Sequence, residues 1–454
     1  MKETLRLIEK HIPEPCKIKL NEKETGNFIY YNIFNERNNN IGCLKFTKTG
    51  ELTFFSYTGE ILKHIKHPLN EKEIIENANA FLNTFVQNKN LKVASVFTYA
   101  SNYRVNYEDK DSKYNLFLPD TGVELTLDLA GNISSFNRKE DNYELITTKK
   151  IITSEEAKSH YLKKLNLDLE ISKPASLNHY KLVYRLNEEI NYVPASGEEP
   201  KLKLIKCNLK SLKPYATSSK NIFRILGLDG DYSKIGKKNK KDCRIELWSK
   251  NSKKELGQLN YNMDDSQSNV IKFKINKHTA QIVQICDGEI LSEEVTSALT
   301  NKKAYDRALD FLFTIYPDAD ELFDKIDLNI DSDEKTNEKH EPNYMFYFNR
   351  VHDSIEVRNQ IAYIGVGKYT GMINKFCAPT VTEKELAHIN VFPKVAEEEA
   401  KRFCANNLKM NLHYKKSVDQ ENNIQYELVY LPVFLEGKTE EILIDAHQGI
   451  IFEA

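Results

Sequence analysis

Lys45-Phe46-Thr47-Lys48-Thr49-Gly50-Glu51-Leu52 is the clearest copy of a pattern that recurs along the chain: a strand, a turn that ends in glycine, and a second strand. The residues before the turn alternate between polar and apolar, which is typical of a half-buried strand. Glycine suits the turn because it adopts a positive φ without a Cβ clash of roughly 1–2 kcal/mol. The pattern therefore predicts repeated β-hairpins. Further copies are Leu127 to Ile133, Tyr192 to Glu199, Phe273 to Ile282, Ile364 to Ile373 and Ile442 to Ile451.

Three helix starts are recognisable by a capping box, in which a small polar residue and a glutamate three positions later bond to each other's backbone N–H groups. Each predicted helix carries a single apolar stripe. The simplest way to bury that stripe is against one face of the sheet formed by the same segment. The boxes are Asn70 with Glu73, Thr153 with Glu156, and Thr382 with Glu385.

The chain has 454 residues, enough for several domains of roughly 100–200 residues each. We predict an α+β fold of serial repeated modules, each an antiparallel β-sheet with a helix packed on one face. The segments are 1–68, a helix with a meander of three strands; 69–148, a helix with an antiparallel sheet that includes Tyr114 to Leu118; 149–290, a module with a β-rich extension; and 291–454, two helix–sheet modules that begin with a helix from Ser292 to Ile315.

Two of these segments match each other in sequence. Glu155-Glu156-Ala157-Lys158 recurs as Glu398-Glu399-Ala400-Lys401, and Tyr180-Lys181-Leu182-Val183-Tyr184 recurs as Tyr426-Glu427-Leu428-Val429-Tyr430. Each pair of motifs is followed by the strand–turn–strand pattern. A unit of helix, two strands, turn and strand is therefore duplicated.

The duplicated unit resembles the PepSY-like modules of the bacterial YcdB/YcdC repeated-domain family. Phe346 to Phe376 also resembles this family, and the likeness spans most of residues 69 to 454. Thr279-Ala280 departs from it, because glycine is expected at that turn. The resemblance implies modules that bind or inhibit other proteins, often peptidases. It supplies no catalytic residue, cofactor ligand or metal ligand.

Composition narrows the choice of partners. A net charge of −2 gives no electrostatic reason to expect nucleic acid or an anionic membrane surface. The first 20 residues predict a short amphipathic helix through Leu5, Ile8 and Ile12 without a signal peptide, and no later stretch suits a membrane span. We therefore predict a cytoplasmic protein. The scattered cysteines, which include no CxxC motif, predict isolated thiols: Cys16, Cys43, Cys207, Cys243, Cys286, Cys377 and Cys404.

The stretch 327–338 is the nearest approach to a metal site. Asp327, Asn329, Asp331 and Glu338 supply oxygens at positions 1, 3, 5 and 12, as in a calcium loop. Ser332 stands where the turn glycine is required, which favours a solvated acidic loop.

Two basic stretches meet only part of the requirements for phosphate or nucleic-acid binding. Gly230 to Lys237 has one residue too many for a phosphate loop, and no Ser or Thr follows the lysine, so a turn at Asp229-Gly230-Asp231 is favoured. Lys237 to Lys241 has few aromatic neighbours and predicts a solvated loop.

Catalytic signatures are weak. His340-Glu341 lacks a partner at metal-binding spacing, and Ala195-Ser196-Gly197 is a hairpin turn and not a nucleophile elbow. Cys377 and His388 could meet only in the folded chain. The carboxylate pairs lack an apolar setting, and the strand tyrosines are expected to pack on a sheet face with hydroxyls at its edge. These residues are Asp128 with Glu124, Asp331 with Asp333, and Tyr30, Tyr184 and Tyr430.

We therefore expect a non-enzymatic binding or regulatory protein. Its partner would be a protein or peptide, added as an extra strand at an exposed sheet edge in the manner of a peptide-binding or peptidase-inhibitor repeat protein. The alternatives are a hydrolase whose site forms between modules and a structural or spore-associated scaffold.

Overall fold

The computed structural model divides into two compact units. Unit 1 contains Met1–Lys163, Asn191–Pro200 and Lys409–Val433, and unit 2 contains Lys164–Ile190, Lys201–Leu408 and Phe434–Ala454. The chain therefore passes repeatedly from one unit to the other. The structure describes residues 2–25, 27–59, 68–86, 90–139, 142–186, 191–198, 208–218, 221–226, 228, 232–251, 257–265, 267–287, 297–327, 342–419, 421–434 and 442–453.

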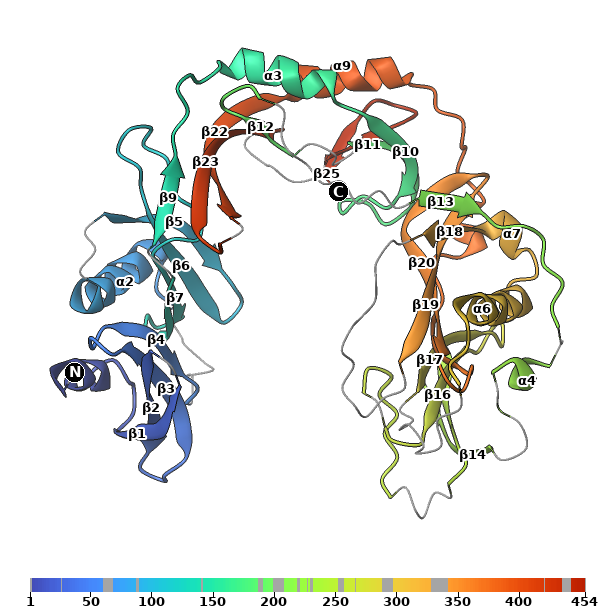
Figure 1. Ribbon diagram of the computed structural model, residues 1–454, viewed down its shortest axis with the longest axis horizontal. Helices are drawn as coiled ribbons and strands as arrows, with labels where there is room; N and C mark the ends of the chain where they lie inside the picture. Colours follow the sequence, from blue (N-terminus) through green and yellow to red (C-terminus); the bar gives the residue numbers. More distant parts are fainter. Residues whose placement is uncertain are drawn as a thin grey trace. The chain divides into compact units, whose positions relative to one another are not determined.

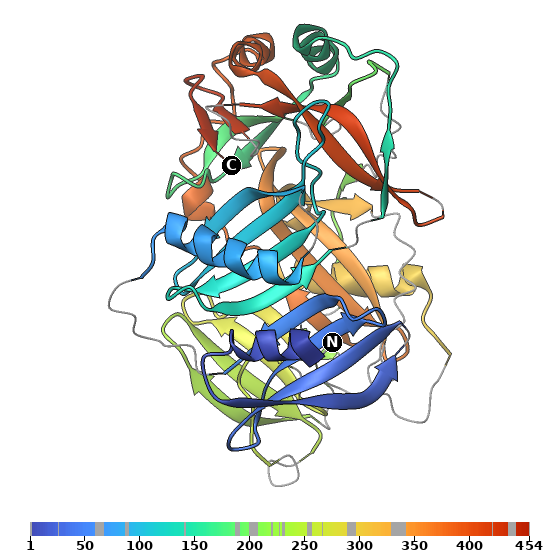
Figure 2. The same ribbon diagram turned by 90° about the vertical axis from the view of Figure 1, so that its left-hand side faces the viewer.

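Unit 1 is built on an eight-stranded antiparallel sheet with the order β1-β2-β3-β4-β8-β7-β6-β5. Helices α1 and α2 cover the same face of this sheet (Figures 1 and 2). The Phe81 ring of α2 packs between Phe55 and Phe136, at 6.4 and 5.6 Å between ring centroids, so both halves of the sheet share one core. The elements are α1 (Lys2–Glu9), β1 (Cys16–Thr25), β2 (Phe28–Asn35), β3 (Asn40–Thr47), β4 (Leu52–Tyr57), α2 (Glu71–Phe85), β5 (Leu91–Thr98), β6 (Asn102–Asp109), β7 (Val123–Asp128) and β8 (Ile133–Arg138).

A second, four-stranded sheet of unit 1 joins segments that lie far apart in the sequence. Strand β23 pairs with β22 and β12 in antiparallel fashion and with β9 in parallel. Helix α3 packs chiefly on β22, β12 and β23 (Figure 1). The elements are β9 (Tyr143–Ile146), α3 (Ser154–Lys163), β12 (Val193–Pro194), β22 (Lys409–Val418) and β23 (Ile424–Val433).

The start of α3 is fixed to this sheet by hydrogen bonds. The Tyr430 hydroxyl donates to the Ile152 carbonyl at 2.6 Å. Ile152 N–H donates to the Ala195 carbonyl and Ala195 N–H to the Leu428 carbonyl, both at 2.9 Å. Helix α3 and strand β12, both of the first duplicate, are thus assembled on strands of the second.

Unit 2 contains the reciprocal arrangement. The Tyr184 hydroxyl donates to the Val395 carbonyl at 2.8 Å. Val395 N–H donates to the Ala446 carbonyl at 2.9 Å, and Ala446 N–H to the Leu182 carbonyl at 3.0 Å. The residues just before α9 and the β24–β25 hairpin, both of the second duplicate, are therefore bonded to strands of the first duplicate.

The prediction that each duplicated helix lies on its own sheet is wrong for α3, which packs chiefly on β22 of the second duplicate. Only Leu408 separates α9 from β22, and α3 ends at Lys163, four positions before β10 begins at Leu167. The single residue between α9 and β22 does not let this strand fold back under its helix, because even a tight turn needs two central residues. The strand therefore runs into the other unit.

The sheet of unit 2 has 13 strands, most of them antiparallel. Helix α6 packs on β19, β20 and β21, and its buried side chains belong to the hydrophobic core of unit 2, which is rich in aromatic rings. Strands β10 and β20 meet through one parallel pair, Ile171 and Val357, which joins the two parts of the sheet. The elements are β10 (Leu167–Ser172), β11 (Lys181–Leu186), β13 (Asn208–Ser211), α4 (Ile222–Leu226), β14 (Ser233–Asn239), β15 (Cys243–Ser249), β16 (Ile271–Asn276), β17 (Ile282–Asp287), α6 (Asn301–Ile315), α7 (Ala319–Leu322), β18 (Phe323–Asp327), β19 (Asn343–His352), β20 (Ile355–Gly367), β21 (Ile373–Cys377), α8 (Glu383–Leu386), α9 (Glu397–Asn407), β24 (Ile442–Asp445) and β25 (Ile451–Glu453).

The described turns confirm five of the six predicted hairpins; in the copy from Tyr192 to Glu199 the turn forms at Gly197, but β12 pairs with β23. Glycine takes a positive φ in five of the six predicted copies, with values of 67° to 90°. Ala280 adopts φ 58° in the remaining copy, so the turn forms without glycine at the cost of a strained alanine. All three capping boxes form, although the one at Thr382 opens a helix of only four residues.

Several local predictions are wrong. The first segment has four strands and not three, because the charged stretch β1 pairs along β2 as a sheet edge. Tyr114 to Leu118 is not a strand, since Asn115 takes φ 58° and only Phe117 makes a bridge, to Lys110. Helix α6 begins at Asn301 because Thr300 caps it.

Candidate functional site

The face of the eight-stranded sheet that points away from α1 and α2 carries one row of mainly polar side chains across six strands. Its members are directly opposite one another in register, while neighbours such as Leu44, Leu125 and Phe136 point into the core. We call this face the outer face. The row consists of Lys45, Phe54, Asn137, Glu124, Asn106 and Ser95.

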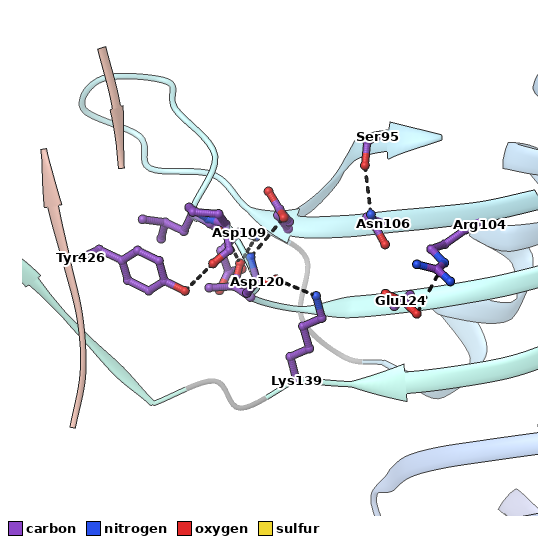
Figure 3. Close-up of polar contacts among 12 residues, drawn as sticks. Ser95, Arg104, Asn106, Asp109, Asp120, Glu124, Lys139 and Tyr426 are labelled. Carbon is purple, nitrogen blue, oxygen red and sulfur yellow. Dashed lines mark hydrogen bonds and ion pairs between the residues drawn. The ribbon is translucent and has the colours of Figure 1, made fainter. Parts of the chain in front are cut away.

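Polar contacts order the side chains at the β5 end of the outer face (Figure 3). Asn106 Nδ2 donates to Ser95 Oγ at 3.0 Å, and Arg104 Nε lies 3.8 Å from Glu124 Oε1. The Arg104 guanidinium also lies 5.5 Å from the ring centre of Tyr99. This end of the sheet therefore presents positioned polar groups next to aromatic rings.

Strand β5 is the last strand of the sheet, and no described strand pairs with its open side. Tyr99 N–H donates to the Asn102 carbonyl at 2.8 Å, which makes these residues a hydrogen-bonded pair. Because antiparallel pairs alternate, the N–H and C=O groups of Thr98 point away from β6. The side chains of Phe97 and Tyr99 are 48% and 46% exposed beside this edge.

A hollow of about 420 Å³ lies farther along the outer face, at the junction of β4 and β8. Lys45, Arg138 and Lys139 contribute the basic groups of its lining, and Glu51 the acidic group. Thr47, Thr53, Asn137, Asn142, Phe28 and Phe54 complete it.

The sequence-predicted calcium loop lies almost entirely outside the described residues. Its first position, Asp327, ends β18, and its carboxylate pairs with Lys210 and with Lys325, whose Nζ lies at 2.6 Å. Hydrogen bonds from these lysines lower the pKa of Asp327. Asp331, Asp333, Glu338 and the pair His340-Glu341 are not described.

The two basic stretches lie largely on strand β14 and not in a loop. Lys237 is a strand residue, so it does not follow a phosphate-binding turn, and Asp229-Gly230-Asp231 lies outside the described residues. Lys238 Nζ lies 5.8 Å from the ring centre of Tyr261. This aromatic neighbour could not be predicted from the sequence, because Tyr261 is 23 residues away from Lys238 along the chain.

The Cys377 thiol is not set up as a nucleophile. Its Sγ lies 3.7 Å from the Ala378 carbonyl and interacts with Tyr363, and among the described residues no hydrogen bond joins it to His388. Burial raises the pKa of the Cys377 thiol. An activated cysteine needs a lowered pKa.

The other predicted groups have structural partners. Asp128 accepts bonds from the backbone of Ala130 and Asn132 at 2.9 Å and so closes a hairpin turn. Tyr30 lies on β2 opposite Lys45. Tyr184 and Tyr430 do not present hydroxyls at a sheet edge. Their hydroxyls donate to the backbone carbonyls of Val395 and Ile152, just before α9 and α3.

One charged cluster in unit 2 was not found from the sequence. Glu170 is 2% exposed, and its Oε2 accepts from Arg185 Nε at 2.8 Å and lies 3.7 Å from Arg358. Glu170 Oε1 has no hydrogen-bond partner among the residues that the structure describes. Burial raises the pKa values of Glu170 and nearby Glu356, although both arginines oppose that shift. The cluster spans the β10–β20 junction, which becomes evident only once these strands are adjacent.

Within the described part of the chain, no three His, Cys, Asp or Glu side chains gather as a metal site. The described helices include none with the length and apolar character of a membrane span.

The model of the YcdB, YcdC repeated domain matches residues 6–140 and 219–380, which together make up more than half of the chain. The chain belongs to the YcdB/YcdC repeated-domain family. It is 22% identical to the uncharacterised protein YcdC of Bacillus subtilis over 338 residues, 73% of this chain and 71% of YcdC. It is 27% identical to the uncharacterised protein YcdB of the same organism over 180 residues, 40% of this chain and 35% of YcdB.

Among solved structures, the C-terminal domain of Bacillus megaterium YpeB is similar to this chain. The similarity covers 41% of this chain and 85% of the YpeB chain. The TM-score is 0.28 and the sequence identity 16%.

Proposed function

We propose that this YcdB/YcdC family protein is a non-enzymatic binding protein that takes up an extended peptide segment of a partner protein along β5. The observation that carries the proposal is the open side of β5, with outward backbone groups at Thr98 and the exposed rings of Phe97 and Tyr99 beside it. Main-chain hydrogen bonds would supply affinity, and the two rings would select apolar side chains.

Comparison with the other terminal strands supports the choice of β5. Natural sheet edges are commonly protected against pairing by lysines. Strand β5 has a single charged residue, Lys92, in eight positions. The other long terminal strands carry several lysines each: Lys17 and Lys19 on β1, Lys234, Lys237 and Lys238 on β14, and Lys409, Lys415 and Lys416 on β22.

The duplicated segments also resemble PepSY-like modules, which are regarded as binding or inhibitory units. We propose that the segments 1–68, 69–148, 149–290 and 291–454 are the repeat units of such a protein. The free cysteines of the described chain support a cytoplasmic location, which cell fractionation tests.

Selection from a displayed library of random peptides, followed by titration of the recovered peptides, tests the binding function. Thr98→Pro removes an outward N–H at an exposed position without removing a ladder bond to β6. Thr98→Ala is the matched control, because it trims the same side chain and keeps that N–H. We expect binding to survive in the control and to weaken about tenfold or more in the proline variant, since several strand contacts depend on the edge. Equal binding by both variants, or no saturable peptide, would contradict the proposal.

A further inference from the structure

Strand β5 lies at the rim of the core of unit 1, and its inner face is only partly covered. Helix α2 packs chiefly on β6 and β7. Val96 faces inward, because it lies opposite the buried Val105 of β6. Val93 faces inward for the same reason, opposite Tyr107. Both valines pack against the core of unit 1 but keep part of their surface exposed, so the core is not closed at this edge.

The outer face of the same strand is apolar where β5 ends. Phe97 lies opposite Arg104 and points to the outer face, where the Arg104 guanidinium also lies 5.5 Å from the ring centre of Tyr99. Arg104 Nε lies 3.8 Å from Glu124 Oε1, so a carboxylate of the same face accompanies this cation (Figure 3). The stretch from Val93 to Tyr99 contains no charged residue. This edge is therefore complementary to an uncharged segment.

The hydrogen-bond pattern fixes the face that each residue of an added strand would reach. Val96 and Thr98 alternate with residues bonded to β6, so their backbone groups point away from it. A residue of an added antiparallel strand that bonds to either one would point to the inner face, because directly paired residues share a face. The residue between those two would point to the outer face, beside Phe97. Consecutive residues of the added strand would thus meet apolar side chains of β5 on both faces.

We propose that the segment taken up along β5 is an uncharged strand that is apolar at consecutive positions. Such runs are typical of strands that are buried on both faces, whereas a half-exposed strand alternates between apolar and polar residues. This proposal rests on the peptide uptake at β5 proposed above, and it names the class of segment that the edge takes.

Titration of the full chain with two dye-labelled synthetic peptides, followed by fluorescence anisotropy, tests this class. The first peptide has four consecutive apolar residues, Val-Ile-Val-Ile, between Lys-Thr and Thr-Lys ends. The second has threonine in place of both isoleucines, which keeps the β-branched shape and the charge but makes the pattern alternate. We expect the first peptide to bind about tenfold more tightly, because two apolar groups are restored and each buried methylene corresponds to about fourfold in affinity.

A protein variant that combines Phe97→Ser with Tyr99→Ser locates the effect on the outer face. With this variant the two peptides should differ by less than about fourfold, because the outward apolar residues lose their neighbours on β5. Phe392→Ser is the matched control, because it removes an exposed phenylalanine of unit 2, and it should keep the full difference. Circular dichroism melting shows whether each variant is folded.

Tighter binding of the consecutive apolar peptide, with the difference lost in the serine variant, would support the proposal. Equal binding of both peptides, or an unchanged difference in the serine variant, would overturn it and leave peptide uptake at β5 intact. Binding of neither peptide would overturn it as well. In that case the displayed library separates the two failures, because peptides recovered from it would show that the edge takes segments of another class, and an empty selection that it takes none.

Discussion

The hydrogen bond between Tyr430 and Ile152 gives the most direct test of the exchanged assembly, in which the helix entry of each duplicate is bonded to a strand of the other duplicate. Tyr430 is 7% exposed, and its hydroxyl donates at 2.6 Å to the carbonyl two residues before α3 begins. Tyr430→Phe keeps the buried ring and removes only the hydroxyl. A net loss of about 1 kcal/mol is typical of one such bond, and the carbonyl left without a donor can raise the cost to about 2 kcal/mol.

Urea unfolding followed by circular dichroism measures this loss. Tyr99→Phe is the matched control because its ring is 46% exposed, and surface changes of this kind usually stay within about 0.5 kcal/mol. Equal unfolding free energies for the two variants would refute the structural role of the Tyr430 hydroxyl.

Hydrogen exchange then locates the effect. In Tyr430→Phe, the amides of α3 should lose protection, although α9 is the helix that precedes Tyr430 in the sequence. In Tyr184→Phe, the loss should occur in α9, because the Tyr184 hydroxyl donates to Val395. Loss of protection in the preceding helix of each variant would contradict the exchanged assembly.

Four further outcomes follow from single sites. Ala280→Gly should raise the unfolding free energy by about 0.5–1 kcal/mol in urea titrations, because the relief of the positive φ outweighs the added entropy of the unfolded state. Since burial raises the pKa of Glu170 above 4.5, the stability of the protein relative to Glu170→Gln should fall as pH rises from 4.5 through the folded-state pKa. Asp445→Asn should show the opposite sign: burial alone raises the pKa of Asp445, but Lys181 and backbone N–H groups lower it below 3.8, so the advantage of Asp445 over asparagine is lost as pH falls through the folded-state value. A slope of the same sign for the two variants would contradict one of the two assignments. Cys404, whose pKa burial raises to about 12, should resist iodoacetamide in the native protein and react in urea, as mass spectrometry of the labelled peptides would show.

Local features could be predicted from the sequence because they depend on neighbours in the chain. The turn at Gly50 and the capping box at Asn70 need only a few adjacent residues, and both form as predicted. The apolar stripe of α2 was also predictable, since its spacing follows the helical repeat. The strand at Tyr114 to Leu118 failed because Asn115 adopts a left-handed conformation, which no periodicity reveals.

The candidate sites could not be predicted in the same way. Ser95, Asn106 and Glu124 form a row only because β5, β6 and β7 take one register, and a shift by one residue would turn them into the core. Lys45 and Lys139 line one hollow although 94 positions separate them.

By itself, the sequence determined the hairpin turns, the helix starts and the duplication of one helix–strand unit, because backbone conformation and capping are set by adjacent residues. Only the tertiary structure decided which helix covers which strands. The single residue between α9 and β22 prevents a local reversal there, and Tyr430 on β23 bonds to the entry of α3, which is distant in the sequence. Strand order likewise decided that β5 lies at the end of its sheet, where no described strand pairs with its open side. The sequence does not reveal this, because every strand has unpaired backbone groups until its neighbours are in position.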